Sequence, residues 1–346
     1  MPKPGLSLLR PAVRLTDTTL IRKEAFSSPS GLPLLMRPQV KGVDLMTWIT
    51  ENRAQLQADL LRYGGLLFRD FELHGVHDFQ ATLDALGIRL MNYIEKATPR
   101  TKVDGQVYTS TIFPPEHVIA LHNELSYVRQ WPGKIAFFCE QAPAIEGETP
   151  IADVRRVLAA IDTEIKEKFR RLGWMLVRNF GSGIGPSWQH SLAVESREEA
   201  EAYLQKSDTQ WIWMDDDRLR TTQRRSSIRC HPQTGEELWF NHIAFWHTSS
   251  MSEEIRRSLT MDLGAENLPY STFYGDGSEI PDDVVAHLRA AYDAETVKFR
   301  WQEGDLLVLD NMLTAHGRSK FTGTRKILTA MGDEVRPVSV VPGSYN

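Results

Sequence analysis

The feature of this sequence that most constrains the fold is a pair of histidine motifs far apart in the chain. His122 precedes Glu124 by two residues, between apolar neighbours, and His316 follows 194 residues later (316 − 122). In an extended strand the side chains at positions i and i+2 leave the same face, so His122 and Glu124 can reach one metal ion. A site that also uses His316 requires a fold in which distant strands lie side by side.

The second motif follows an apolar run near the C-terminus. Residues 304–311 (Gly-Asp-Leu-Leu-Val-Leu-Asp-Asn) predict a turn, a buried strand and a polar exit toward His316. Arg325 comes nine residues after His316 (325 − 316) and opens another apolar run over residues 325–331. Two histidines and one carboxylate form the facial triad of non-haem Fe(II) oxygenases, which leaves coordination positions open. A nearby arginine can hold a bidentate acid through its planar guanidinium group.

Taken singly, these residues have ordinary structural explanations. His122 and Glu124 alone are more often a partly exposed strand pair than a metal site, and Arg325 alone would be a surface arginine on a strand. The joint pattern favours the metal site. For Arg318, a structural ion pair explains the residue as well as a place in the site does. Asn241 is a candidate substrate contact, because a buried amide in a strand needs partners. Three further histidines in or beside the predicted strand that contains Asn241 are expected to be structural, namely His231, His242 and His247.

The same residues resemble a known family. Their order, His-x-Glu, then Thr, then His, then Arg, is similar to the motif of the taurine dioxygenase (TauD/TfdA-like) family of Fe(II)/2-oxoglutarate-dependent oxygenases. Thr149 occupies the place of that family's cosubstrate-binding threonine, 27 residues after His122 (149 − 122). The resemblance spans residues 60–332. The segments that most resemble the SyrP-like branch, many of whose members oxidise amino acids for peptide natural products, are residues 122–124, 147–150, 239–241 and 316–318.

The resemblance implies a dioxygenase with three site components. His122, Glu124 and His316 would bind Fe(II). Thr149 and Arg325 would bind the distal carboxylate of the cosubstrate 2-oxoglutarate, whose other end chelates the metal and leaves one position for O2. The carboxylate of Glu124 favours hydroxylation over chlorination, because related halogenases have a small residue at that position. Desaturation and ring closure remain open outcomes.

The resemblance also narrows the substrate. Family members that act on taurine carry a further arginine four residues after the cosubstrate arginine, whereas this chain has Thr329. We therefore expect hydroxylation of an unactivated C–H bond in an amino acid or amino-acid-derived substrate, free or tethered to a carrier protein, in natural-product biosynthesis. One alternative is a catabolic dioxygenase of a small organic acid. Another is a non-catalytic, cupin-like metal- or ligand-binding protein, which could dispense with Thr149 and Arg325.

Composition and charge bear on the remaining partners. The chain has 346 residues, of which 41% are hydrophobic, enough for a substantial core. A net charge of −5 gives no electrostatic case for nucleic acid or for an anionic membrane surface. No apolar run approaches the length of a membrane span and the N-terminus lacks a signal peptide's apolar core, so we expect a cytoplasmic protein. Cys139 and Cys230 are expected to be buried thiols, because they form neither a disulfide framework nor zinc spacing.

Hydrophobic periodicity predicts isolated helices that alternate with many short strands. No linker is evident, so the chain is expected to be a single domain over residues 1–346, with residues 1–40 as an irregular N-terminal arm. The family resemblance makes this an α+β fold, a double-stranded β-helix (jelly-roll) core with flanking helices and a long insertion between core strands. Residues 92–117 predict a polar loop that is either a lid or substrate wall, or a solvated connector. The main predicted elements are helices over residues 43–63, 76–86, 154–172 and 281–292, a hairpin over 226–241, and a strand over 297–301.

Overall fold

Apolar strands from both halves of the chain pair into one large sheet, which we call the major sheet. The computed structural model describes residues 20–92, 100–111 and 113–336, and eight strands of this described part pair in the order β1-β2-β3-β17-β7-β20-β5-β4. Neighbours are antiparallel except β2 and β3. The bounds are β1 (Ile21–Ala25), β2 (Leu34–Pro38), β3 (Gly65–Phe68), β4 (Lys102–Asp104), β5 (Val107–Thr109), β7 (Trp131–Gln141), β17 (Leu306–Asp310) and β20 (Lys326–Val335).

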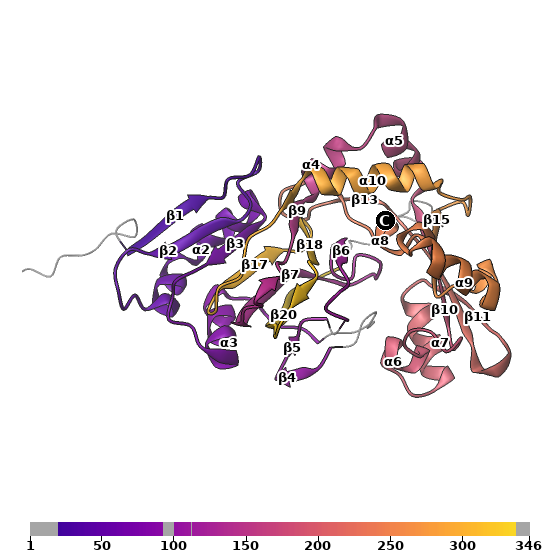
Figure 1. Cartoon of the computed structure of the whole chain (residues 1–346), viewed down its shortest axis with the longest axis horizontal. Coiled ribbons are helices and arrows are strands. Elements are labelled where there is room, and N and C mark those ends of the chain that lie inside the picture. Colours follow the sequence, from indigo (N-terminus) through magenta and orange to yellow (C-terminus); the bar gives the residue numbers. More distant parts are fainter. Residues whose placement is uncertain (1–19, 93–99, 112, 337–346) are drawn as a thin grey trace, which may run out of the picture.

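A smaller, minor sheet packs against one face of the major sheet (Figure 1). Its strands follow the order β16-β9-β18-β6. They are β6 (Ile119–His122), β9 (Ile151–Asp153), β16 (Thr296–Val297) and β18 (Thr314–Arg318). Alternate residues of β7 point to opposite faces, so Phe137 packs in the core toward the minor sheet while Phe138 packs on the other side. The ring centroids of Phe137 and His316 are 5.1 Å apart, which places β18 directly over β7.

Two helices cover the other face of the major sheet. They are α2 (Leu45–Tyr63) and α3 (Gly75–Leu86). The Asp44 side chain accepts a hydrogen bond from Thr47 N and begins α2, and Gly64, with φ of 77°, ends it. In α3, Phe79 stacks on Phe138 of β7 with ring centroids 5.7 Å apart. Full burial of one such ring contributes about 1.5–3 kcal/mol, so these contacts fix both helices to the sheet.

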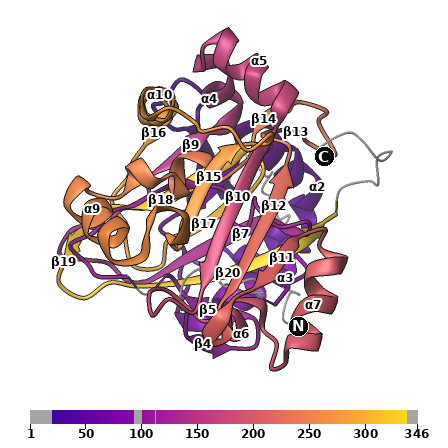
Figure 2. The same ribbon diagram turned by 90° about the vertical axis from the view of Figure 1, so that its right-hand side faces the viewer.

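The segment between β9 and β16 is the predicted long insertion, and it lies at the side of the two sheets (Figure 1). Four of its strands form a separate antiparallel sheet in the order β11-β12-β10-β15, which faces the viewer in Figure 2. These strands are β10 (Trp174–Phe180), β11 (Gln210–Trp213), β12 (Leu219–Arg225) and β15 (Tyr270–Tyr274). Its helices are α4 (Val154–Ala160), α5 (Thr163–Leu172), α6 (Trp188–Leu192), α7 (Arg197–Lys206), α8 (Ile243–Trp246), α9 (Glu253–Leu263) and α10 (Asp282–Ala294).

Short elements complete the described part. The predicted hairpin is confirmed as β13 (Ile228–Cys230) paired with β14 (Glu237–Trp239). A second pair joins β8 (Ile145–Glu146) to β19 (Phe321–Thr322). Single-turn 3-10 helices are η1 (Asp215–Asp217), η2 (Thr248–Ser250) and η3 (Ala265–Asn267). Within the described residues, no helix combines the length and the apolar character needed to cross a bilayer.

Several predicted boundaries are wrong. Residues 21–38 are not an irregular arm, because β1 and β2 pair at the edge of the major sheet; residues 1–19 lie outside the described part. The predicted helix over residues 154–172 is two helices, because the chain is extended at Ile161 (φ −74°, ψ 134°). Of the predicted strand over residues 297–301, Val297 alone lies in a strand, at the end of β16. Cys139 is buried as expected, but Cys230 is exposed.

Candidate functional site

The adjacent strands β6 and β18 place two histidines opposite each other. His122 and His316 are direct partners across this antiparallel pair, and their ring centroids lie 4.6 Å apart. The strands approach closely at Gly317, where a Cβ atom would lie 2.6 Å from the carbonyl oxygen of Ile119. A glycine after His316 therefore permits the close pairing. The structure thus brings the two distant motifs together.

The carboxylate reaches the histidines by a route that strand geometry does not predict. β6 ends at His122, so Glu124 lies in a turn and not two residues further along a strand. The turn is held by Asn311, whose Oδ1 accepts a hydrogen bond from Glu124 N (2.8 Å) and whose Nδ2 donates to the Glu124 carbonyl (2.9 Å). Leu125 follows with φ of 55° and reverses the chain. As a result, Glu124 Oε2 lies 3.7 Å from His316 Nε2.

These three side chains form one donor set. One ligand atom from each of His122, Glu124 and His316 lies within 4.8 Å of the others. His122 Nδ1 is 2.9 Å from the Ala120 carbonyl oxygen, which places a proton on Nδ1 and leaves the Nε2 lone pair for a metal. Among the described residues, the buried His316 Nδ1 has no hydrogen-bond partner. Two imidazoles and one carboxylate suit Fe(II), so the residues present fit the metal that the motif implies.

Burial keeps the histidines neutral. The pKa of His316 lies well below its ordinary value, first because burial disfavours the charged ring and then because His122 and Arg100 are close. Burial also lowers the pKa of His122, although Glu124 opposes the shift. Neutral imidazole is the form that binds a metal, so both rings are ready as ligands at neutral pH.

Thr149 and Arg325 line the same small pocket as both histidines. Arg325 Nη2 donates to Thr149 Oγ1 (3.3 Å), and its Nε donates to the Gly147 carbonyl (2.9 Å). Arg325 Nη1 donates to Ser110 Oγ (3.1 Å). Burial lowers the pKa of Arg325 to about 10, so the guanidinium remains charged at neutral pH. A buried cation beside a hydroxyl is suited to a carboxylate ligand.

The other candidate residues have partners within the protein. Asn241 Nδ2 donates to the Ser227 carbonyl (3.0 Å) and its Oδ1 accepts from Ile243 N (3.0 Å), so the amide stabilises the chain before α8; its predicted substrate contact stays a prediction. Arg318 donates to three loop carbonyls, those of Phe113, Pro114 and His117, and is held by them and not by a carboxylate. The three structural histidines are hydrogen-bonded as expected, His231 to Asp310 (3.3 Å), His242 to Ser126 (2.5 Å) and His247 to the Ile280 carbonyl (3.1 Å).

Sequence reasoning missed several residues of the site. Arg100 Nη2 donates to Glu124 Oε2 at 2.6 Å. Phe245 and His242 lie against the His122 ring, at centroid distances of 4.8 and 5.4 Å. Arg100 and Ser110 both belong to the polar loop predicted as a lid or substrate wall, which was the available signal. Arg100 is the one arginine of residues 92–117, but no spacing rule assigns it to the site.

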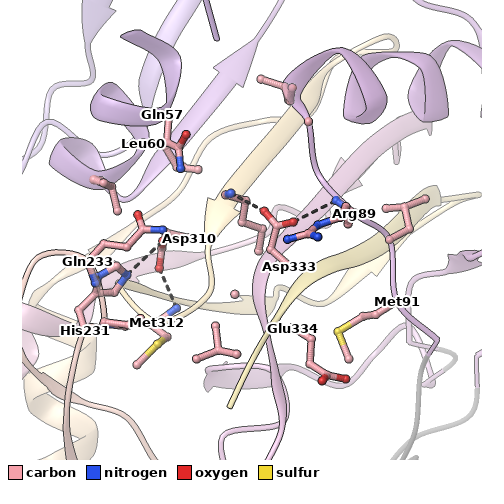
Figure 3. Close-up of a pocket in the computed structure, with 18 of the residues that line it drawn as sticks. Gln57, Leu60, Arg89, Met91, His231, Gln233, Asp310, Met312, Asp333 and Glu334 are labelled. Atoms are coloured by element: carbon pink, nitrogen blue, oxygen red, sulfur yellow. Dashed lines mark hydrogen bonds and ion pairs between the residues drawn. The ribbon is translucent and has the colours of Figure 1, made fainter. Parts of the chain in front are cut away.

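A separate hollow lies away from this donor set (Figure 3). Several of its charged groups are held by contacts within the protein. Lys134 Nζ contacts Asp333 Oδ2 at 2.5 Å, and Asp333 Oδ1 accepts from Arg89 N at 3.0 Å. His231 and Asp310 form a further pair. These contacts hold the end of β20 against β7 and do not converge on a ligand position.

Comparison with known proteins identifies the family. The model of the family described as "Taurine catabolism dioxygenase TauD, TfdA family" matches residues 29–331. The chain is 38% identical over 313 residues to the dapdiamide synthesis protein DdaC of Enterobacter agglomerans, covering 87% of this chain and 95% of that protein. It is 28% identical over 295 residues to a clavaminate synthase-like protein of Arabidopsis thaliana, covering 82% and 86%.

Similar solved structures support the fold. PvcB of Pseudomonas aeruginosa has a TM-score of 0.55 at 15% identity, with 92% of this chain and 93% of that chain covered. A taurine dioxygenase of Burkholderia xenovorans has a TM-score of 0.53 at 16% identity, with 93% and 96% covered. These similarities confirm the expected α+β jelly-roll fold. With the family model matched over most of its length, this chain belongs to the TauD/TfdA family and is an Fe(II)- and 2-oxoglutarate-dependent dioxygenase.

Proposed function

We propose that this enzyme hydroxylates an unactivated C–H bond of an amino acid or amino-acid-derived substrate, free or carrier-tethered, in natural-product biosynthesis. His122, Glu124 and His316 bind the Fe(II), and Thr149 and Arg325 bind the distal carboxylate of 2-oxoglutarate. The observation that carries this assignment is the convergence of the three donor atoms within 4.8 Å, with both histidines lining a pocket that Arg325 also lines.

Each residue has a stated task in this proposal. The Ala120 carbonyl orients His122, and Asn311 fixes the turn that presents Glu124. The Arg325 guanidinium supplies a charged, planar partner for a carboxylate. When bound, Fe(II) and 2-oxoglutarate would supply the electrons that activate O2 for attack on a C–H bond, and the cosubstrate would be converted to succinate and CO2. The rings of Phe137 and Phe245 flank the histidines and limit the access of water to them.

The choice of substrate class rests on names and on one departure from the motif. DdaC is named for dapdiamide synthesis, and PvcB is titled an Fe, alpha-ketoglutarate dependent oxygenase from an isonitrile synthetic pathway. Both names favour a biosynthetic role for the present chain. Thr329, which stands where taurine-acting members have a further arginine, is fully buried in β20 and offers no charge to a sulfonate. The SyrP-like branch stays a prediction.

The main alternative is a catabolic dioxygenase of a small organic acid, which the family description itself favours. Such an enzyme would use the same metal and cosubstrate residues, so only the substrate separates the two proposals. A non-catalytic, cupin-like binding protein would have no use for the Arg325–Thr149 contact. We place the enzyme in the cytoplasm, where free thiols such as Cys139 and Cys230 stay reduced.

The test is a substrate screen under controlled oxygen. The protein is loaded anaerobically with Fe(II) and 2-oxoglutarate, amino acids are added free or on a carrier protein, and succinate is measured after O2 is admitted. We expect rapid succinate release with a subset of amino-acid substrates and none from His316→Ala. Release with small organic acids but with no amino acid would favour the catabolic alternative. Failure to bind 2-oxoglutarate at all would remove both.

A further inference from the structure

Arg100 contacts one of the proposed metal-binding residues, whereas Arg325 contacts Thr149. The Nη2 atom of Arg100 donates to Glu124 Oε2 at 2.6 Å, and the two side chains are only 4% and 6% exposed. Arg100 lines the same pocket as both histidines, Thr149 and Arg325. Three arginines line the pocket together with the two histidines. Arg318 is held by loop carbonyls, whereas Arg325 lies beside Thr149 and Arg100 lies beside Glu124.

We propose that Arg100 is a second arginine of the 2-oxoacid pocket, which binds and charge-balances the carboxylate at the metal end of the cosubstrate. This inference rests on the proposed roles of His122, Glu124 and His316. Nothing in the family motif or in the relatives' names assigns a role to this residue.

The physical reason is the crowding of like charges at the metal end. The carboxylate of Glu124 and the 2-oxoacid carboxylate that would chelate the metal share one buried site, where neighbouring carboxylates repel each other and the charge of Fe(II) offsets part of that repulsion. A guanidinium already in contact with Glu124 offsets that repulsion. One guanidinium carries five N–H donors in a fixed fork and can serve two carboxylates at once. An ammonium or an amide could not match both the charge and the geometry.

A purely structural role for Arg100 explains less. The backbone of Glu124 is already fixed by Asn311 on both its N–H and its carbonyl, so the turn does not depend on Arg100. A buried ion pair also costs desolvation energy that its own attraction often fails to recover, which makes it a weak device for stability alone. Arg100 contacts the carboxylate of Glu124, and that carboxylate is the part of Glu124 that faces the site.

The proposal predicts that replacing Arg100 changes the affinity for 2-oxoacids but does not weaken the affinity for Fe(II). Removing a cation from beside the site relieves its repulsion of Fe(II), so Arg100→Gln should bind Fe(II) no more weakly than the parent. The same variant should bind 2-oxoacids roughly 10- to 100-fold more weakly, the loss expected for one charge-assisted hydrogen bond. A merely structural arginine would not separate these two quantities.

The experiment uses two cosubstrate probes. 2-Oxoglutarate and 2-oxobutyrate are each titrated into the anaerobic Fe(II) protein, followed by the visible absorbance of the metal–2-oxoacid complex. 2-Oxobutyrate has the chelating end but no distal carboxylate. Arg100→Gln should weaken both acids by a similar factor, whereas Arg325→Gln should weaken 2-oxoglutarate and leave 2-oxobutyrate near the parent. The matched control is Arg156→Gln, which breaks a 2.6 Å pair with Glu295 on a half-exposed arginine outside the pocket and should change neither acid.

The outcomes separate this inference from the proposed function. A parent protein that gives no 2-oxoglutarate complex contradicts the proposed function itself. A parent that binds both acids, with Arg100→Gln titrating identically, overturns only the role of Arg100. A parallel loss of Fe(II) and 2-oxoacid affinity overturns it as well, because Arg100 then acts through Glu124 alone. If Arg100→Gln does not fold, Arg100→Lys is titrated in the same way. Its affinities for 2-oxoglutarate and 2-oxobutyrate must then fall together, by a smaller factor than expected for Arg100→Gln.

Discussion

Glu124 determines how many positions the proposed metal site leaves open. Glu124→Ala should lose at least 10- to 100-fold in Fe(II) affinity, since even indirect ligand partners have effects of that size, and it should not hydroxylate. With chloride supplied, the vacated position admits an anion, so the products are also examined for chlorination. Glu116→Ala is the control, because that carboxylate is exposed on the neighbouring loop. Undiminished hydroxylation by Glu124→Ala would remove this residue from the ligand set.

Arg325 should determine the affinity for 2-oxoglutarate and have little effect on that for iron. Losing one partner of a buried charge pair costs about 2–5 kcal/mol, so Arg325→Ala should bind the cosubstrate roughly 30- to several-thousand-fold more weakly. Arg325→Lys should recover part of this loss, because an ammonium lacks the planar fork. Thr149→Val removes a neutral hydroxyl worth about 1 kcal/mol and should cost roughly fivefold. Anaerobic 2-oxoglutarate titration measures all three, and parental affinity in Arg325→Ala would assign the distal carboxylate to another residue.

At the scale of elements, the contact between β6 and β18 sets the separation of the two histidines. An alanine at Gly317 would place its Cβ 2.6 Å from the Ile119 carbonyl oxygen, a distance that real contacts do not show. Gly317→Ala should therefore push the strands apart and lower Fe(II) affinity at least tenfold, as loss of ligand geometry does. Calorimetric titration with Fe(II) measures the effect. The control is Gly42→Ala, a left-handed glycine with nothing within 4 Å, which should bind iron normally at a modest cost in stability.

The elements that carry local signals were predictable from the sequence. Helices α2 and α3 each have an apolar face, and each helix ends at a glycine. The strands β13 and β14 are joined by a turn sequence. The two histidines were found because a motif and an apolar strand mark them. Glu124 was found for a partly wrong reason, since its turn depends on Asn311, 187 residues away (311 − 124).

The features that the sequence analysis did not predict lack a local signal in the sequence. β1 and β2 lie at the sheet edge, where β1 pairs with β2 and β2 pairs with β3, and periodicity does not indicate this pairing. The helix over residues 154–172 looked continuous because Ile161 keeps the apolar spacing across the break. Arg100 is recognisable only from its contact with Glu124 across a folded loop. Partners elsewhere in the sequence place β2 in the sheet and Arg100 beside Glu124, and a local pattern does not contain them.

For the molecule as a whole, the buried histidines predict a pH dependence of stability. Burial lowers the pKa of His122 and His247 and lowers those of His242 and His316 further, whereas an unfolded histidine titrates near about 6.5. Below that pH the unfolded chain binds more protons than the folded one. The stability of the metal-free protein should therefore be fully present above about pH 6.5 and fall as the pH drops below it, by up to about 1.4 kcal/mol per pH unit for each such histidine.

Urea unfolding of the metal-free protein between pH 7.5 and 5.5 measures this dependence. His242→Gln, which keeps a polar side chain but does not titrate, should show a shallower slope by one histidine. A parent whose unfolding free energy is flat across this range would mean that these rings are not held neutral by the fold.

The central places of β17 and β20 in the major sheet have a consequence for how the protein is made. β17 lies between β3 and β7, and β20 lies between β7 and β5, yet both strands come from the last part of the chain. At synthesis rates of about 5–20 residues per second, His316 leaves the ribosome roughly 10–40 s after His122. During that interval β7 has neither neighbour in the sheet. Its unpaired backbone edges and its apolar side chains are then exposed to other nascent chains and to chaperones. Iron delivery to the complete donor set can begin only after this delay, when the strand that carries His316 has emerged and paired.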